Sequence, residues 1–344
     1  MSKGSTKFQP LDDIKTILIT GGAGFIGSWV TRHLALVYQE SYRVICLDKL
    51  DDVASMRNIE DLLSLRNFTF VHGDITSSED LGRAFKENNV DCVLHFAALS
   101  HVQDSFKDPV AFNVNNVCGT LTLLEAIRAY GNVKRFIHVS TDEVYGQIED
   151  DFANESQILQ PTSPYSASKA AAEMHVLAYQ KSFGLPAIVV RSNNVYGPHQ
   201  YPQKIIPLFI LKAMKGDKLP IQGSGMHSRR YLYGADAADA FDTILHQGCL
   251  GSTYNISSTH ELRNIDIAFK ILLLHGFDAR DRPSEYIEWV ADRPFNDSNY
   301  KIDDSRLRNL GWQQKTDFDA GLKVTVEWYQ KHAQNWWMSK PVPN

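Results

Sequence analysis

A run of glycines near the start of the chain constrains the fold more than any other feature. Residues 15–20 read KTILIT, residues 21–27 read GGAGFIG, and a helical stretch, SWVTRHLALVY, follows over 28–38. Glycines at this spacing between a strand and a helix permit a tight turn and let a pyrophosphate approach the backbone at the helix N-terminus. The sequence therefore predicts a dinucleotide-binding strand, turn and helix, although the same glycines could simply form a turn.

An acidic residue at the end of the second expected strand refines this prediction. Asp48 follows Gly27 by 21 residues, where a carboxylate accepts hydrogen bonds from an adenosine ribose and repels a 2′-phosphate. We therefore expect NAD rather than NADP, although Lys49 comes next; the alternative is that Asp48 caps a loop. The residues of this part of the chain that we expect to bind the cofactor are Gly21, Gly24, Phe25, Ile26, Gly27, Asp48, Lys49, Asp74, Ile75, Ala97 and Ala98.

Strand-like and helical stretches alternate through the first half of the chain. Runs such as RVICLD (43–48) and RFIHVST (135–141) are mostly apolar, which is typical of a parallel sheet covered on both faces. We expect the α/β class, with a Rossmann-type doubly wound parallel sheet and a smaller C-terminal substrate-binding lobe. Prolines and glycines interrupt the pattern after about residue 195. The expected divisions are a flexible segment over 1–14, an NAD-binding domain over 15–195, and mainly the lobe over 196–344.

Composition argues against several classes of protein. The chain is 43% hydrophobic and 22% charged, so it can bury a core, and its net charge of -5 argues against a general nucleic-acid binder. The four cysteines are far apart, so neither a disulfide framework nor a metal site is expected. No apolar run approaches the ~20 residues that span a bilayer, and the polar start lacks a signal-peptide core. We therefore expect a cytoplasmic protein with no metal, membrane or nucleic-acid partner.

A tyrosine and a lysine four residues apart are candidates for catalysis. Tyr165 and Lys169 share one face of an expected helix that begins near Pro164. The lysine charge, together with an oxidised nicotinamide, would lower the pKa of the phenol toward that of a useful base. The alternative is an amphipathic helix with an ordinary surface lysine.

Two adjacent acids follow the fifth expected strand. Thr141, Asp142 and Glu143 stand at its carboxyl end, where open α/β sheets present their ligands. Neighbouring residues of a regular strand point in opposite directions, so both acids reach one substrate only if the backbone turns here. Taken alone, such a run is also typical of a solvated loop.

Together these segments resemble a known family. The order of GGAGFIG, HFAA, STDEVYG, YSASK, RSNNVYGPHQYP and DRPFND is similar to that of the extended short-chain dehydrogenases/reductases, specifically the nucleotide-sugar 4,6-dehydratases that act on dTDP- or UDP-glucose. The similarity runs from about residue 15 to 330. The Thr-Asp-Glu run discriminates best, because the related 4-epimerases and decarboxylases lack the adjacent acid pair.

The resemblance implies a role for each candidate. Tyr165 would take the proton of the sugar C4 hydroxyl while hydride passes to NAD, with Lys169 on the cofactor ribose and Thr141 on the C4 oxygen. Glu143 would then remove the C5 proton and Asp142 would protonate the departing C6 hydroxyl, after which the hydride returns to C6. The implied contacts to the nucleotide-diphosphate hexose are Ser100, Thr141, Asn194, Lys204, Arg229, Arg293 and Asp297.

The chain departs from the family pattern at positions around the cofactor and sugar. These positions are Leu99, Gln103, Asn299 and the pair Asp51-Asp52. The sequence therefore says more about the type of reaction than about the substrate. Two alternatives remain: an epimerase or reductase of the same fold, and a NAD-binding regulatory protein without catalysis.

The resemblance also implies a homodimer. The expected helices near 110–130 and 165–183 resemble the pair that forms a four-helix dimer interface in this family. Their apolar residues include Ala172, Met174, Val176 and Leu177. Burial of this face within one chain is the alternative.

Overall fold

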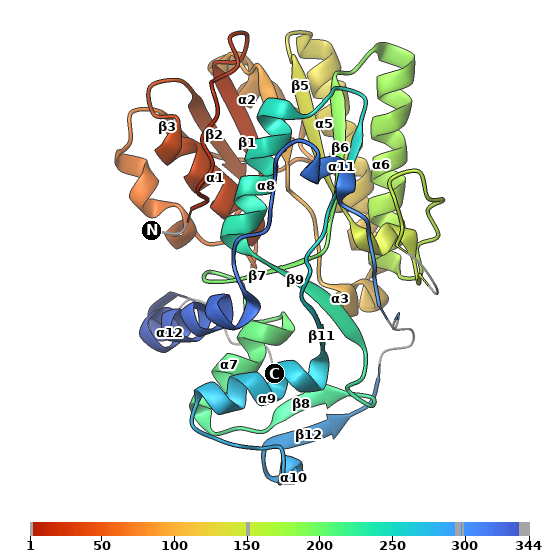
Figure 1. The fold of residues 1–344 in the computed structure, drawn as a ribbon. Helices are drawn as coiled ribbons and strands as arrows, with labels where there is room; N and C mark the ends of the chain where they lie inside the picture. Colours follow the sequence, from red (N-terminus) through yellow and green to blue (C-terminus); the bar gives the residue numbers. More distant parts are fainter. Residues whose placement is uncertain (1–2, 149–151, 293–296, 298, 337–344) are drawn as a thin grey trace.

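A seven-stranded parallel sheet forms the centre of the larger part of the molecule (Figure 1). The computed structural model describes residues 3–148, 152–292, 297 and 299–336. The strand order is β10-β6-β5-β4-β1-β2-β3. The strands are β1 (Thr16–Thr20), β2 (Arg43–Asp48), β3 (Phe68–His72), β4 (Cys92–His95), β5 (Arg135–Thr141), β6 (Ala187–Ser192) and β10 (Thr253–Ile256). The predicted Rossmann-type α/β class is confirmed.

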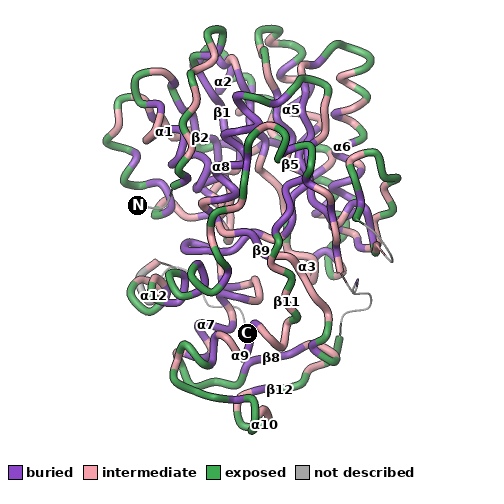
Figure 2. The backbone as a smooth tube through the Cα atoms, in the orientation of Figure 1, coloured by how far each residue is buried: buried purple, intermediate pink, exposed green. Residues whose placement is uncertain are grey.

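Helices cover both faces of this sheet because its strands are apolar on both. In β1, Ile17 and Ile19 pack on one side with α1 and α8, whereas Leu18 packs on the other side with α2, α5 and α6. Figure 2 shows the strands as the most continuously buried part of the fold. The helices are α1 (Phe25–Val37), α2 (Ser78–Asn88), α5 (Gly119–Tyr130), α6 (Pro164–Phe183) and α8 (Gly234–Gln247).

The strand order places a crevice beside β1. The chain runs from β1 outward through β2 to β3, then crosses back to β4 on the other side of β1. Loops that leave the carboxyl ends of β1 and β4 therefore diverge, and open α/β sheets bind ligands at such a point.

The smaller lobe lies beyond the carboxyl ends of the strands (Figure 1). Its helices pack through a second apolar core that includes Phe209, Ile271 and Leu322. Its strands are β7 (Asn194–Tyr196), β8 (Leu219–Gln222), β9 (Ser228–Tyr233), β11 (Glu261–Arg263) and β12 (Ile287–Val290). Its helices are α7 (Ile205–Lys215), α9 (Asn264–Leu274), α10 (Pro283–Tyr286) and α12 (Phe318–Trp336). The remaining short helices of the described chain are η1 (Met56–Asn58), η2 (Glu60–Ser64), α3 (Val102–Lys107), α4 (Pro109–Phe112), η3 (Asn113–Cys118), η4 (Asp142–Tyr145) and α11 (Ser305–Arg308).

The second half of the chain is shared between the two parts. Helix α8 packs on α1, and β10 pairs in parallel with β6 at the edge of the large sheet. Only part of 196–344 therefore belongs to the lobe, because these apolar segments find their partners on the sheet.

The start of the chain also differs from the expected flexible segment. Residues 3–14 lie against α1 and α8 through buried groups: the Thr6 hydroxyl bonds Asp242 at 2.7 Å, and the Phe8 amide donates to the Tyr38 hydroxyl at 2.9 Å. A methyl group on Gly4 would overlap the carboxylate of Asp239. These bonds give this polar segment a fixed path.

One helical run is long and apolar enough, by length and composition alone, to cross a membrane. Helices α4, η3 and α5 are continuous from Pro109 to Tyr130. Core helices of folded domains often have the same length and composition. Here the run packs against α2 and α6 on one face of the sheet.

Candidate functional site

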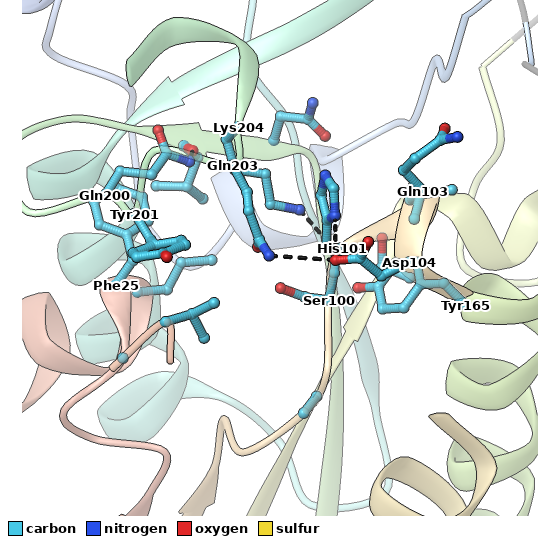
Figure 3. Close-up of a pocket in the computed structure, with 18 of the residues that line it drawn as sticks. Phe25, Ser100, His101, Gln103, Asp104, Tyr165, Gln200, Tyr201, Gln203 and Lys204 are labelled. Carbon is cyan, nitrogen blue, oxygen red and sulfur yellow. Dashed lines mark hydrogen bonds and ion pairs between the residues drawn. The ribbon is translucent and has the colours of Figure 1, made fainter. Parts of the chain in front are cut away.

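A cavity of about 830 Å³ opens at the carboxyl ends of the strands, between the sheet and the lobe. Its walls come from the glycine turn, the ends of β2, β4 and β5, helix α6 and the lobe strands β8, β9 and β12. Figure 3 shows Gln203 and Lys204 approaching Ser100 and Asp104 from the opposite wall. The predicted site residues that line it are Gly21, Gly24, Phe25, Ile26, Gly27, Asp48, Lys49, Asp74, Ile75, Ala97, Ala98, Ser100, Thr141, Glu143, Tyr165, Lys169, Asn194, Lys204, Arg229 and Asp297.

The glycine turn can only be made with glycine. Gly21 has a φ of 70°, and a Cβ there would lie 2.6 Å from the backbone nitrogen of Ala97. A methyl group on Gly27 would overlap the Gly21 carbonyl oxygen. The turn therefore packs directly on the β4 loop and leaves the start of α1 facing the cavity, as a bound pyrophosphate requires.

Asp48 links this turn to the end of β2. Its carboxylate accepts hydrogen bonds from the backbone amides of Ala23, at 3.0 Å, and Leu50, at 2.8 Å. Burial raises the pKa of Asp48 above its usual value, and the two amides act against that rise. Lys49 is occupied elsewhere, since its Nζ donates to Asn115 at 2.7 Å and lies 3.7 Å from Asp74.

The start of α6 places Tyr165 and Lys169. Ser163 caps the helix in a capping box with Ser166, and Pro164 occupies the first turn. The Lys169 ammonium donates to the Val139 carbonyl at 2.7 Å. Burial lowers the pKa of Lys169 to about 8.

The phenol environment differs from the sequence expectation. Burial and the negative charge of Glu143 raise the pKa of Tyr165, and a hydrogen bond to the Thr141 hydroxyl acts in the opposite direction. The sequence expectation rests on the positive charges of Lys169 and of an oxidised nicotinamide, and it includes neither burial nor the charge of Glu143.

The acid pair sits on a backbone turn, as its use on one substrate requires. A single 3₁₀ turn, η4, starts directly after β5, and the Thr141 hydroxyl caps it by accepting from the Glu143 amide at 3.3 Å. Glu143 reaches the cavity wall, whereas Asp142 lies just behind it and is 2% exposed. Burial, and then the charge of Glu143, raise the pKa of Asp142 to about 7. The two acids therefore have different environments.

The residues assigned to the substrate form two groups. Lys204 donates to the Ser100 carbonyl at 2.7 Å and so joins opposite walls of the cavity. Arg229 donates to the Asp297 carbonyl at 2.9 Å. Asn194 stands at the start of β7 on the cavity wall. Arg293 lies outside the described residues.

The positions that depart from the family pattern differ in whether they line the cavity. Gln103 and Asp51 line the cavity. Leu99 is held through its backbone, which exchanges hydrogen bonds of 2.8 and 3.0 Å with the Asn116 side chain. The structure gives no lining role to Asn299.

Several residues of the site were not found from the sequence. Tyr300 lines the cavity, its hydroxyl bonds Asp297, and Arg229 lies 4.7 Å above its ring. Asn193 bonds Asp142 at 2.6 Å. Tyr300 carried no sequence signal, whereas the Asn-Asn pair at the end of β6 could have drawn attention to Asn193.

Comparisons with known proteins agree with this site. Residues 18–325 match a family model described as GDP-mannose 4,6 dehydratase. A trifunctional UDP-glucose 4,6-dehydratase/UDP-4-keto-6-deoxy-D-glucose 3,5-epimerase/UDP-4-keto-L-rhamnose-reductase of Arabidopsis thaliana is 48% identical over 96% of this chain and 49% of its own length. The dTDP-D-glucose 4,6-dehydratase of Homo sapiens is 41% identical over 94% of this chain and 92% of its own.

A solved structure gives the same result. The dTDP-glucose 4,6-dehydratase from Bacillus anthracis, in complex with NAD, superposes with a TM-score of 0.85 and 39% identity, covering 95% of this chain and 100% of that one. The chain spans about half the length of the trifunctional relative that it matches. The match nevertheless extends over nearly the whole of this chain, glycine turn, acid pair and lobe included, so the chain belongs to the GDP-mannose 4,6 dehydratase family of extended short-chain dehydrogenases/reductases.

Proposed function

We propose that the protein is an NAD-dependent nucleotide-sugar 4,6-dehydratase that converts dTDP- or UDP-glucose into the 4-keto-6-deoxy sugar. One observation carries the proposal: Asp142, whose pKa burial raises to about 7, is buried beside Glu143, which lines the cavity together with Tyr165 and Lys169. Elimination of water needs one proton donor and one proton acceptor close together near neutral pH. A sugar epimerase of this fold would have no use for such a pair.

The cofactor wall of the cavity fits NAD. The glycine turn leaves room for a pyrophosphate, and Asp48 faces the cavity where the adenosine ribose would lie. Ala97 and Ala98 add little side-chain bulk beneath it. When bound, NAD supplies the acceptor and later the donor of a hydride. The Bacillus anthracis relative was crystallised with NAD.

Different side chains of the site carry out the separate proton transfers of the reaction. Tyr165 accepts the proton of the sugar C4 hydroxyl as a phenolate, a form that the positive charges of Lys169 and of bound NAD would favour against burial and Glu143. Thr141 holds the same oxygen, and Lys169 lies one helical turn below Tyr165. Oxidation of C4 to a ketone makes the C5 proton acidic. Glu143 removes that proton, and Asp142 protonates the C6 hydroxyl so that it departs as water. Glu143 then returns the proton to C5 as C6 takes up the hydride that bound NAD would supply.

The lobe would hold the nucleotide diphosphate. Arg229 and Lys204 are two of the cations that line the cavity, and charged donors suit a diphosphate. Ser100, Asn194 and Asp297 add polar contacts to the sugar and nucleotide end, and Arg293 joins them by family resemblance. The named relatives act on UDP- or dTDP-glucose, which makes these two nucleotides the first to test.

The direct test is a panel of substrates. The purified protein is incubated with UDP-glucose, dTDP-glucose and GDP-mannose, with and without added NAD, and the products are weighed by mass spectrometry. We expect a product lighter by one water from UDP- or dTDP-glucose, and none from Asp142→Asn or Glu143→Gln. Turnover of a sugar without loss of water would contradict the proposal and favour an epimerase. Binding of NAD without any turnover would favour a regulatory protein.

We also propose a homodimer that works in the cytoplasm. Val110, Val114 and Met174 are 69%, 50% and 46% exposed on adjoining helices, and an apolar patch of this kind suits a protein interface. Ala172 and Val176 are buried within the chain, so they do not contribute to it. The four described cysteines form no disulfide, as in a reducing compartment. Sedimentation of the protein and of Met174→Lys would test the dimer; a monomeric wild type would contradict it.

A further inference from the structure

Asn193 makes the shortest hydrogen bond to the proposed acid. It follows the last residue of β6, is 3% exposed, and its Nδ2 lies 2.6 Å from Oδ2 of Asp142. Its neighbour Asn194, not Asn193, is the residue assigned to substrate contact.

The contacts around Asn193 determine which way its amide points. Its Oδ1 lies 3.0 Å from the backbone nitrogen of Ser258 and 3.0 Å from the Ser257 hydroxyl. A backbone N–H can only donate, so the atom facing it must be the amide oxygen. The amide nitrogen must therefore face Asp142. Both serines directly follow β10, whose pairing with β6 fixes their position.

The donor from Asn193 restricts where Asp142 can carry a proton. An amide N–H cannot accept a hydrogen bond, so Oδ2 of Asp142 has to remain an acceptor. The other oxygen, Oδ1, lies 3.1 Å from the Thr141 hydroxyl, which can donate or accept by rotation. A protonated Asp142 therefore bears its hydrogen on Oδ1, on the side of Thr141, which lines the cavity.

We propose that Asn193 is a positioning residue for the elimination step. It holds the Asp142 carboxyl group in one orientation and confines its transferable proton to Oδ1. This inference rests on the proposed dehydratase function. In this role Asn193, which also lines the cavity, acts through Asp142. The C4 oxidation step does not use the Asp142 proton and is therefore independent of Asn193.

The groups around Asp142 predict how loss of the Asn193 side chain changes the pH dependence of water release. The Asn193 donor favours the charged carboxylate and lowers the pKa of Asp142, against burial and the charge of Glu143, which raise it. Loss of the donor therefore raises the pKa of Asp142, and the acid stays protonated to higher pH. A merely structural role for Asn193 would lower rates without moving the pH dependence.

The test compares two steps in one turnover. Single-turnover reactions with substrate are run from pH 6 to 9. The absorbance of the reduced cofactor measures C4 oxidation, and mass spectrometry measures the release of water. For Asn193→Ala we expect oxidation at the wild-type rate and water release slowed about tenfold or more. The alkaline limb of water release should move up by about one pH unit.

Further variants keep the inference testable if the alanine variant folds poorly. Asn193→Ser retains one donor and should recover part of the water release; Asn309→Ala, an exposed asparagine, should match wild type in both steps. If Asn193→Ala and Asn193→Ser both release water at the wild-type rate and with the wild-type pH dependence, the role of Asn193 is overturned but the proposed function is not. A wild type that releases no water would overturn the proposed function, and this inference with it.

Discussion

At the scale of single residues, the site depends on giving two neighbouring acids different environments. Asp142 is buried behind Thr141, whereas Glu143 reaches the cavity. Burial in a medium of low polarity disfavours a charged carboxylate, and the adjacent charge of Glu143 adds to this effect. One acid thus retains its proton near neutral pH without any metal ion in the proposed chemistry.

The raised pKa of Asp142 predicts how elimination depends on pH. Asp142 must be protonated to act as an acid, so single-turnover release of water should fall above about pH 7, by about tenfold per unit. The fall should begin below the pH of about 8 at which Lys169 loses its charge. A rate that stays constant to pH 9 would remove Asp142 from the role of acid.

The buried carboxyl group of Asp142 should destabilise the folded protein when it is ionised. Ionising a buried carboxyl group whose pKa rises from 3.8 to about 7 costs roughly 4 kcal/mol. Below about pH 4 both folded and unfolded chains hold the proton and no cost arises; it grows up to about pH 7 and then stays constant. Asp142→Asn should therefore unfold at a higher temperature than wild type at pH 8 and at the same temperature at pH 4.

A matched carboxylate checks this reasoning. Asp217→Asn changes an exposed residue just before β8 and should leave the melting temperature unchanged at both values of pH. Equal melting temperatures for Asp142→Asn and wild type at pH 8 would contradict the burial argument.

At the scale of elements, the glycine turn joins β1 to α1 with no space for a side chain. Gly27→Ala would drive a methyl group into the Gly21 carbonyl, so we expect loss of most NAD binding by titration calorimetry. Gly82 lies in α2, where an added methyl group would meet nothing within 4 Å. Gly82→Ala should stabilise the protein by about 0.5–1 kcal/mol and bind NAD normally. Normal NAD binding by Gly27→Ala would count against the turn as the cofactor site.

The last helix of the lobe also supports this turn. Trp336 in α12 donates to Oδ1 of Asn58 at 2.9 Å, and Asn58 in turn donates to the Ala23 carbonyl at 2.8 Å. Trp336→Phe removes the first donor, so we expect NAD affinity several-fold weaker than wild type. Trp289→Phe, at an exposed tryptophan of β12, is the control. Equal affinities for both variants would show that α12 does not support the turn.

At the scale of the whole molecule, the sequence predicted what depends on local pattern. The glycine turn, the Tyr165–Lys169 pair and the acid pair each carry a spacing that their local structure requires. The turn, Tyr165, Lys169 and Glu143 line one cavity, and Asp142 is buried behind its wall. The contribution of Asn193 could not be predicted in this way. Its amide orientation depends on Ser257 and Ser258, which are more than sixty residues away along the chain.

The division of the chain shows the same limit. A proline-rich change in composition marked the start of the lobe, but α8 and β10 return to the sheet because their apolar faces match α1 and β6. The polar segment 3–14 carried no periodic pattern, and buried carboxylates such as Asp242 hold it in place. Contacts between distant segments decide both outcomes, and a single sequence does not display them.

The most direct test of the whole account follows one hydrogen atom. UDP-glucose and dTDP-glucose carrying deuterium at C4 are incubated with the protein, and the product is analysed by mass spectrometry and NMR. The account predicts a product lighter by one water, with the deuterium transferred to C6. A product that keeps its mass and carries the deuterium at C4 would contradict it, because C4 would then be oxidised and reduced again without elimination.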